Sequence, residues 1–116
     1  MEILDKDTVS KLVDEAFIFR SLEGYIRKRL KELAVPKAFG AGEFLMREDE
    51  QGREMVILAS GLVEVSQIGS DADVSLATLK PGAVIGEVSV ITGTARTSTV
   101  KALEDSVVVS FKAEVI

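Results

Sequence analysis

The sequence contains neither cysteine nor histidine. Without cysteine the chain can form no disulfide and no zinc–thiolate site. Without histidine it has no imidazole to act as a metal ligand, proton shuttle or general base. These absences remove the usual machinery of most cofactor-free hydrolases and of metal-dependent small barrels, so we expect no catalytic residue, no metal and no cofactor.

Long hydrophobic runs are also missing from the chain. No apolar run approaches the roughly 18 residues that span a bilayer. Residues 1–7 lack the basic-then-apolar order of a secretory signal. We therefore expect a cytoplasmic protein that does not contact the membrane.

The chain is long enough and apolar enough for one folded domain, with 116 residues of which 47% are hydrophobic. Its net charge of -5 is unevenly spread: residues 1–36 carry seven acids and seven bases, whereas residues 37–116 carry twelve acids and seven bases. The acidic second part argues against direct contact with nucleic acid. It still leaves room for one small anion held by a local cation.

Residues 1–36 show helical spacing, because their apolar residues recur at three- and four-residue steps. Asp7 or Thr8 is the expected helix cap, and Ser21 and Gly24 indicate a break between two helices. The basic residues within 27–31 fill the polar positions of the second helix. We interpret them as a solvated face, with a nucleic-acid patch as the alternative.

From residue 37 onward, short alternating apolar runs are separated by turn residues. The runs lie at 44–46, 55–59, 62–68, 74–79 and 107–111, and the turn signals lie at 49–52, 60–61, 69–71 and 81–82. Short strands at a spacing of roughly 8–12 residues indicate an all-β sandwich or barrel. We predict a single domain in which a helical segment, 1–36, packs on a mainly β part, 37–116.

One stretch, residues 84–100, departs from the strand pattern. Its first half predicts a single helical turn that begins at Gly86, and the unpaired amides and partial positive charge of a helix start favour an anion. Arg96 lies ten residues later, and we expect its guanidinium to fold back toward the same anion. Glu87 would repel a bare phosphate but would accept a hydrogen bond from a ribose hydroxyl, so the stretch suits a sugar phosphate.

This stretch resembles the phosphate-binding cassette of the cyclic-nucleotide-binding domain family. The family pattern is Phe-Gly-Glu-(Leu or Ile)-Ala-Leu followed by Pro-Arg-(Ala or Thr)-Ala-Thr-Val. Here Ile-Gly-Glu-Val-Ser-Val occupies 85–90 and Ala-Arg-Thr-Ser-Thr-Val occupies 95–100. The Gly-Glu-Phe-Leu at 42–45, the Ser-Gly at 60–61 and the Leu-Lys-Pro-Gly at 79–82 also match, in the family's order.

The resemblance implies a mainly β fold, a β-roll or double-stranded β-helix that forms a jelly-roll-like barrel, with N-terminal helices and a short helix in the cassette. It implies cAMP or cGMP as the ligand. A threonine after the cassette arginine occurs in family members that prefer cGMP and in members that accept both nucleotides. Thr97 therefore leaves cGMP open, and we favour cAMP.

The resemblance also implies a role for each polar group of the cassette. Arg96 would pair with the exocyclic phosphate oxygen, Glu87 would accept from the ribose 2′-hydroxyl, and nearby backbone amides would complete the phosphate cradle. Thr97 and Ser98 would lie near the base. The predicted ligand-binding residues are Gly86, Glu87, Val88, Ser89, Arg96, Thr97 and Ser98.

The chain departs from the family pattern in several places. Ile85 replaces a phenylalanine and Ala95 a proline, which predicts a less rigid cassette, and Ser89 replaces an alanine. The family follows its last strand with a hinge helix and a lid helix, whereas this sequence stops at Ile116. We therefore expect a domain that lacks the C-terminal lid helix.

The leading hypothesis is a regulatory module, not an enzyme, that binds a cyclic nucleotide and relays the signal to an effector domain, an effector protein or a second copy in a homodimer. The alternative is a degenerate domain of the same fold that binds no nucleotide and serves as an interaction or dimerisation module. At the residue scale, the competing interpretation of Arg96 is an exposed strand arginine paired with Glu104 or Asp105. For Glu87 it is an acid favoured by the helix dipole.

Overall fold

The computed structural model describes residues 4–68, 73–87, 90, 93, 95–96 and 98–112, with the backbone alone at residues 68, 73 and 74. Within these residues the chain is mainly β, as predicted, with few helices. The elements are α1 (Lys6–Glu15), a 3₁₀ turn η1 (Phe17–Phe19), α2 (Gly24–Leu33), β1 (Val35–Phe39), β2 (Phe44–Met46), β3 (Glu54–Ser60), β4 (Val63–Ile68), β5 (Asp73–Leu79), β6 (Val84–Ile85), β7 (Thr99–Ala102) and β8 (Ser106–Lys112).

The helical segment begins at a cap that lies earlier than predicted. The Asp5 side chain accepts a hydrogen bond from the Thr8 backbone amide at 2.7 Å, so Asp5 caps α1. The prediction of Asp7 or Thr8 is wrong because both lie inside the first helical turn. The predicted break is confirmed, since η1 separates α1 from α2 and Gly24 is the first residue of α2.

The strands form two four-stranded sheets with the orders β1-β8-β3-β6 and β2-β7-β4-β5. Every pairing is antiparallel. Strand β1, which contains Pro36, was not predicted from the sequence. Proline cannot donate to a strand ladder, but β1 lies at the edge of its sheet, where that missing donor is tolerated.

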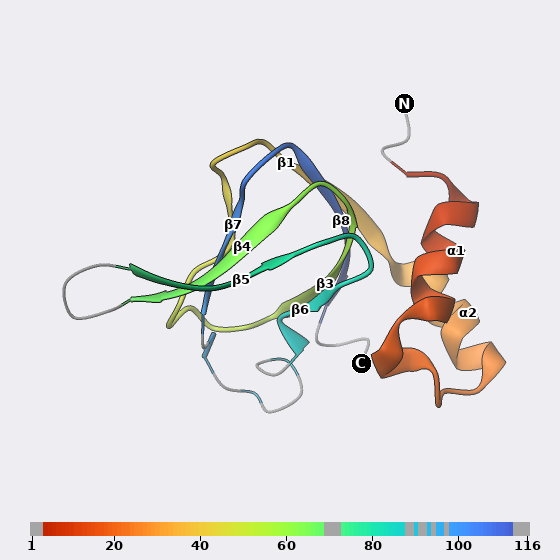
Figure 1. Ribbon diagram of the computed structural model, residues 1–116. Coiled ribbons are helices and arrows are strands. Elements are labelled where there is room, and N and C mark those ends of the chain that lie inside the picture. The colour runs from red at the N-terminus through yellow and green to blue at the C-terminus, as the bar shows by residue number, and fades with distance from the viewer. Residues whose placement is uncertain are drawn as a thin grey trace.

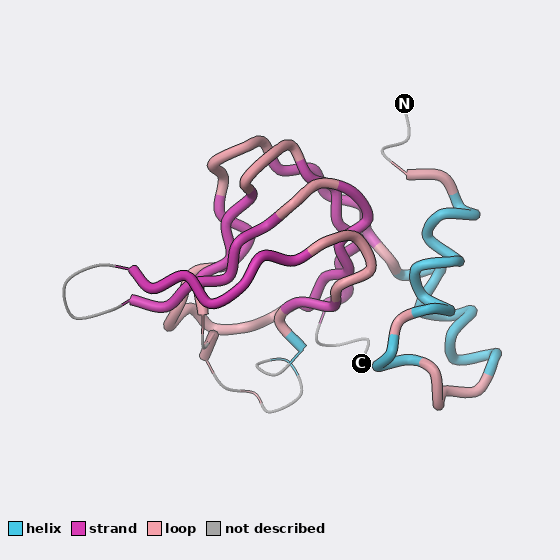
Figure 2. Tube along the Cα trace, viewed as in Figure 1, coloured by secondary structure: helices cyan, strands magenta, loops and turns pink. Residues whose placement is uncertain are grey.

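Strand alternation gives the first sheet two apolar faces. One face packs against the helices through residues such as Met55 and Phe111, and Phe111 meets Phe19 of η1 edge-on at 5.5 Å between ring centroids. The other face packs against the second sheet through residues such as Val56 and Val108. The molecule therefore has a helical layer and two sheet layers, as Figure 1 shows and Figure 2 shows by element type.

The predicted cassette lies at a crossing between the two sheets. It leaves β6, an edge strand of the first sheet, and re-enters at β7, an inner strand of the second. The two described ends of the cassette therefore lie where the chain passes from the first sheet to the second.

Candidate functional site

Gly86 opens the cassette in a backbone conformation that favours glycine. It directly follows the buried Ile85 and has a φ of 85°. A Cβ at this position would lie 2.5 Å from Arg96 Nη1 and 2.6 Å from Met46 Cε. The backbone angle therefore favours glycine, and a Cβ at this position would displace the end of the Arg96 or Met46 side chain. Glu87 follows in helical conformation.

Arg96 folds back onto the first half of the cassette. Its side chain is buried, with 7% of the residue exposed. Nη1 donates to the Gly86 carbonyl oxygen at 3.0 Å, and Nη2 donates to the Glu54 carbonyl oxygen. The competing interpretation of Arg96 as an exposed strand arginine is wrong, because its burial places it inside the fold. The Arg96 side chain thus connects the second half of the cassette to its first residue, Gly86.

The backbone of Arg96 is held by the loop between β2 and β3. The Arg96 amide donates to the Glu50 carbonyl oxygen at 2.7 Å, and the Asp49 amide donates to the Arg96 carbonyl oxygen at 2.9 Å. Gln51 forms an isolated antiparallel bridge with Ala95. From the sequence, this loop was interpreted only as a turn. A single sequence carries no local signal for such a long-range pairing.

A polar cluster lies beside Arg96 at the start of β3. The Glu54 carboxylate accepts hydrogen bonds from Lys37 Nζ at 2.9 and 3.0 Å. It also accepts one from the Ser110 hydroxyl. Lys37, Glu54 and Ser110 come from β1, β3 and β8, which are neighbours in the first sheet. None of the three was predicted from the sequence, because only the strand register brings them together.

The charges of this cluster influence one another. Burial lowers the pKa of Arg96, while the negative charges of Glu54 and Glu50 act in the opposite direction. The guanidinium stays protonated at every physiological pH. Burial raises the pKa of Glu54, but the hydrogen bonds from Ser110 and Lys37 and the charges of Lys37 and Arg96 outweigh burial and lower it overall. Glu54 is therefore an ionised carboxylate at neutral pH.

The remaining predicted site residues are only partly described. Glu87 and Ser98 are both half-buried. Within the described part of the chain, the Glu87 carboxylate has no hydrogen-bond or ionic partner. Val88, Ser89 and Thr97 lie outside the described residues. The structure therefore brings Gly86 and Arg96 together and places Glu87 directly after Gly86.

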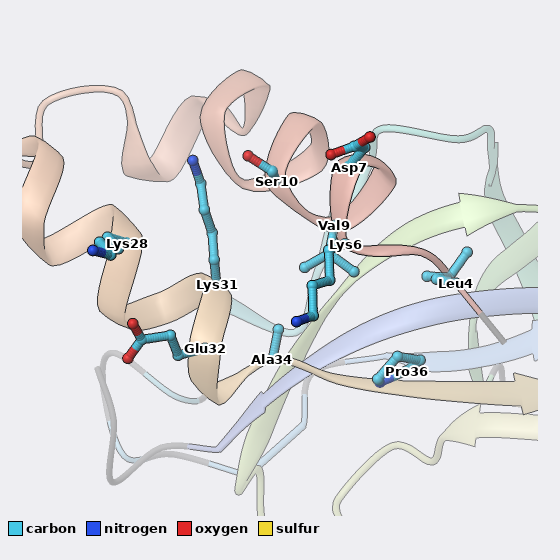
Figure 3. A pocket seen from close by; sticks show the side chains of 10 residues that line it. All are labelled: Leu4, Lys6, Asp7, Val9, Ser10, Lys28, Lys31, Glu32, Ala34 and Pro36. Atoms are coloured by element: carbon cyan, nitrogen blue, oxygen red, sulfur yellow. The ribbon is translucent and has the colours of Figure 1, made fainter. Parts of the chain in front are cut away.

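A groove of about 610 Å³ lies elsewhere, between the start of α1, the end of α2 and the start of β1. Figure 3 shows its lining residues, which include three lysines and two acids: Lys6, Lys28, Lys31, Asp7 and Glu32. Lys31 is engaged by Asp14 at 2.9 Å. None of the described cassette residues lines this groove, so the groove is distinct from the site that Gly86 and Arg96 form.

Two kinds of feature are absent from the described residues. They contain no helix that is both long and apolar enough to cross a membrane. They also contain no group of three or more acidic side chains arranged to hold a metal ion.

A family model described as "Cyclic nucleotide-binding domain" matches residues 36–116. Among curated proteins, a component of a cyclic nucleotide-gated cation channel of Drosophila melanogaster is 38% identical over a 73-residue alignment that covers 58% of this chain and 11% of the channel protein. The cAMP-dependent protein kinase type II regulatory subunit of the same fly is 26% identical over 101 residues, which are 87% of this chain and 27% of the kinase protein. The chain thus spans only a minor part of either relative.

The fold is also similar to solved structures. The regulatory domain of Toxoplasma gondii PKA, solved as a co-crystal with cAMP, superposes with a TM-score of 0.93. The sequence identity is 19%, and the match covers 99% of this chain and 44% of that chain. At this identity the likeness shows the fold.

Proposed function

Because the chain belongs to the cyclic nucleotide-binding domain family, we propose that it is a regulatory module that binds a cyclic nucleotide at residues 86–98. The observation that carries the proposal is the buried Arg96 guanidinium against the Gly86 carbonyl. The Gly86 and Glu54 carbonyl oxygens accept hydrogen bonds from the guanidinium but carry no full negative charge. A phosphate bound beside Gly86 would bring such a charge directly to the guanidinium, and this pairing is among the stronger ones in proteins.

The predicted site residues then take the roles that the family resemblance implies. Arg96 binds the exocyclic phosphate oxygen, and backbone amides of Gly86, Val88, Ser89 and Thr97 complete the cradle. Glu87 accepts from the ribose 2′-hydroxyl, which suits a carboxylate without a partner among the described residues. Thr97 and Ser98 lie near the base. We favour cAMP over cGMP as the ligand.

The proposal is binding without turnover. The sequence has no histidine or cysteine to serve as a base, nucleophile or metal ligand. A phosphodiesterase assay with cAMP and cGMP tests this point, and release of AMP or GMP at a rate proportional to protein concentration would contradict it.

The bound state would act on a partner in the cytoplasm. The curated relatives are a channel component and a kinase regulatory subunit, so an effector domain, an effector protein or a second copy of this chain are the proposed recipients of the signal. In this proposal residues 37–116 close into the β-roll of the family, and residues 1–36 form the helical layer on it.

Calorimetry with cAMP, cGMP and AMP tests the binding directly, on the unaltered chain, on Arg96→Ala and on Arg29→Ala. Arg29 is an exposed helix arginine that pairs with Glu32, so it controls for the loss of one positive charge. Truncating one partner of a buried charge pair costs about 2–5 kcal/mol. We therefore expect Arg96→Ala to bind about 30-fold more weakly or worse, and Arg29→Ala to bind normally.

Two results would contradict the proposed function. One is no measurable binding of any cyclic nucleotide by the unaltered chain, which would favour an interaction or dimerisation module of the same fold. The other is equal affinity of the unaltered chain and Arg96→Ala, which would move the ligand away from the cassette.

A further inference from the structure

Glu54 interacts with Arg96 through a backbone hydrogen bond and through the charge of its carboxylate. Its backbone carbonyl accepts a hydrogen bond from Arg96 Nη2. Its carboxylate belongs to the same residue and adds a negative charge that acts on the guanidinium. An anionic ligand at the cassette would form an ionic interaction with the same guanidinium. Glu54 is therefore both a support for Arg96 and a potential competitor of the ligand.

The Glu54 carboxylate is held by other partners. Lys37 Nζ approaches both carboxylate oxygens, at 2.9 and 3.0 Å, and Ser110 donates a hydroxyl. These contacts are partly buried, since the side chains of Lys37 and Glu54 are 40% and 34% exposed. Lys112 lies opposite Glu54 in the β3–β8 register but is exposed, so solvent screens its charge. Among the described residues, Lys37 is thus the cation that forms a salt bridge with this carboxylate.

We propose that Lys37 is a positioning residue for the ligand site: by engaging the Glu54 carboxylate, it prevents that carboxylate from competing with an anionic ligand for Arg96. This inference rests on the proposed function, in which the anionic ligand is the phosphate of the cyclic nucleotide. Ser110 assists by fixing the same carboxylate from β8. Lys37 itself does not touch the ligand, so its effect passes entirely through Glu54 and Arg96.

The mechanism predicts a rescue that a purely structural lysine would not produce. In Lys37→Met, the Glu54 carboxylate loses its contacting cation and turns its charge toward Arg96. Cyclic-nucleotide affinity should fall by about tenfold, the size expected when one close charge pair is disturbed. In the double variant Lys37→Met/Glu54→Gln, the competitor is neutral and the affinity should return to within about threefold of the unaltered chain.

The experiment is calorimetry with cAMP on the full 116-residue chain, on Lys37→Met, on Glu54→Gln and on the double variant. Lys31→Met is the matched control, because Lys31 forms a similar 2.9 Å bridge to Asp14 on the helices. We expect Glu54→Gln and Lys31→Met to bind within about threefold of the unaltered chain. Urea unfolding of each variant tests whether that variant is folded. If Lys37→Met does not fold, Ser110→Ala replaces it and should show a smaller loss that Glu54→Gln also rescues.

The outcomes separate the two proposals. If the unaltered chain binds cAMP and Lys37→Met binds equally well, the inference about Lys37 is overturned and the proposed function stands. The same holds if Lys37→Met weakens binding but Glu54→Gln fails to restore it, because the lysine then acts structurally. If the unaltered chain binds no cyclic nucleotide, the proposed function fails and the inference fails with it.

Discussion

At the scale of single residues, Gly86 shows how closely the cassette is packed. Gly86 and Gly82 both adopt a left-handed backbone conformation, with φ angles of 85° and 99°. The surroundings differ, because a Cβ at Gly82 would meet nothing within 4 Å, whereas one at Gly86 would meet Arg96 and Met46. Comparing alanine substitutions at the two glycines therefore distinguishes the cost of the left-handed backbone from the cost of side-chain crowding.

We expect Gly82→Ala to lower the free energy of unfolding by about 1–2 kcal/mol, the cost of the left-handed conformation alone, and to leave ligand affinity unchanged. Gly86→Ala should lose more stability and should also weaken cAMP binding by about tenfold or more, because the new methyl group displaces the Arg96 side chain. Urea unfolding and calorimetry measure both effects. Equal losses of stability and unchanged affinity in both variants would mean that Gly86 matters only for its backbone angle.

The residue scale also shows where sequence patterns succeed. Gly61, Gly82 and Gly86 all have positive φ, and glycine between apolar runs predicted turns at the first two because other residues adopt this conformation at a cost. Asp5 escaped prediction as a helix cap because Asp7 and Thr8 are equally suitable in type. The choice of N-cap depends on where the chain enters the helix, and the local sequence does not distinguish these three positions.

At the scale of elements, η1 joins the helical layer to the first sheet. Phe19 is buried and its ring contacts Phe111 of β8. Phe17, two residues earlier on the same turn, is 83% exposed. These two phenylalanines share their secondary structure and differ in burial, so they form a matched pair.

We expect Phe19→Ala to lower the free energy of unfolding by about 3–5 kcal/mol, because it removes a buried aromatic ring and leaves a cavity between η1 and β8. Phe17→Ala should change it by less than about 0.5 kcal/mol. Denaturant unfolding followed by circular dichroism provides both values. A comparable loss in the two variants would show that Phe17 is covered in solution.

The sequence predicted most of the helices and strands but missed β1. The runs of β2, β3, β4, β5 and β8 follow from alternation and turn residues, and α1 and α2 follow from helical spacing. β1 was missed because Pro36 argues locally against a strand. Its pairing with β8 at the edge of the sheet makes the missing amide harmless. Edge position is a property of the assembled sheet, so no local pattern reveals it.

At the scale of the whole molecule, ligand binding should stabilise the fold. A ligand that binds only the folded state adds about 2.7 kcal/mol when its concentration is 100-fold above Kd. We therefore expect the thermal unfolding midpoint of the unaltered chain to rise with cAMP concentration. Arg96→Ala should show no rise over the same range, and AMP should shift neither protein. An equal rise in both proteins would place the stabilising site outside the cassette.

The sequence by itself determined the class of the fold, the break between the helices, the glycine turns and the order of the cassette residues. These follow from periodicity and backbone preferences, which act over a few neighbouring residues. Tertiary structure alone decided that Arg96 is buried, that the Gly86 and Glu54 carbonyls accept its hydrogen bonds, and that Lys37 and Ser110 engage Glu54. Those contacts depend on the register of β1, β8 and β3, and register is set by the packing of whole strands rather than by any local pattern.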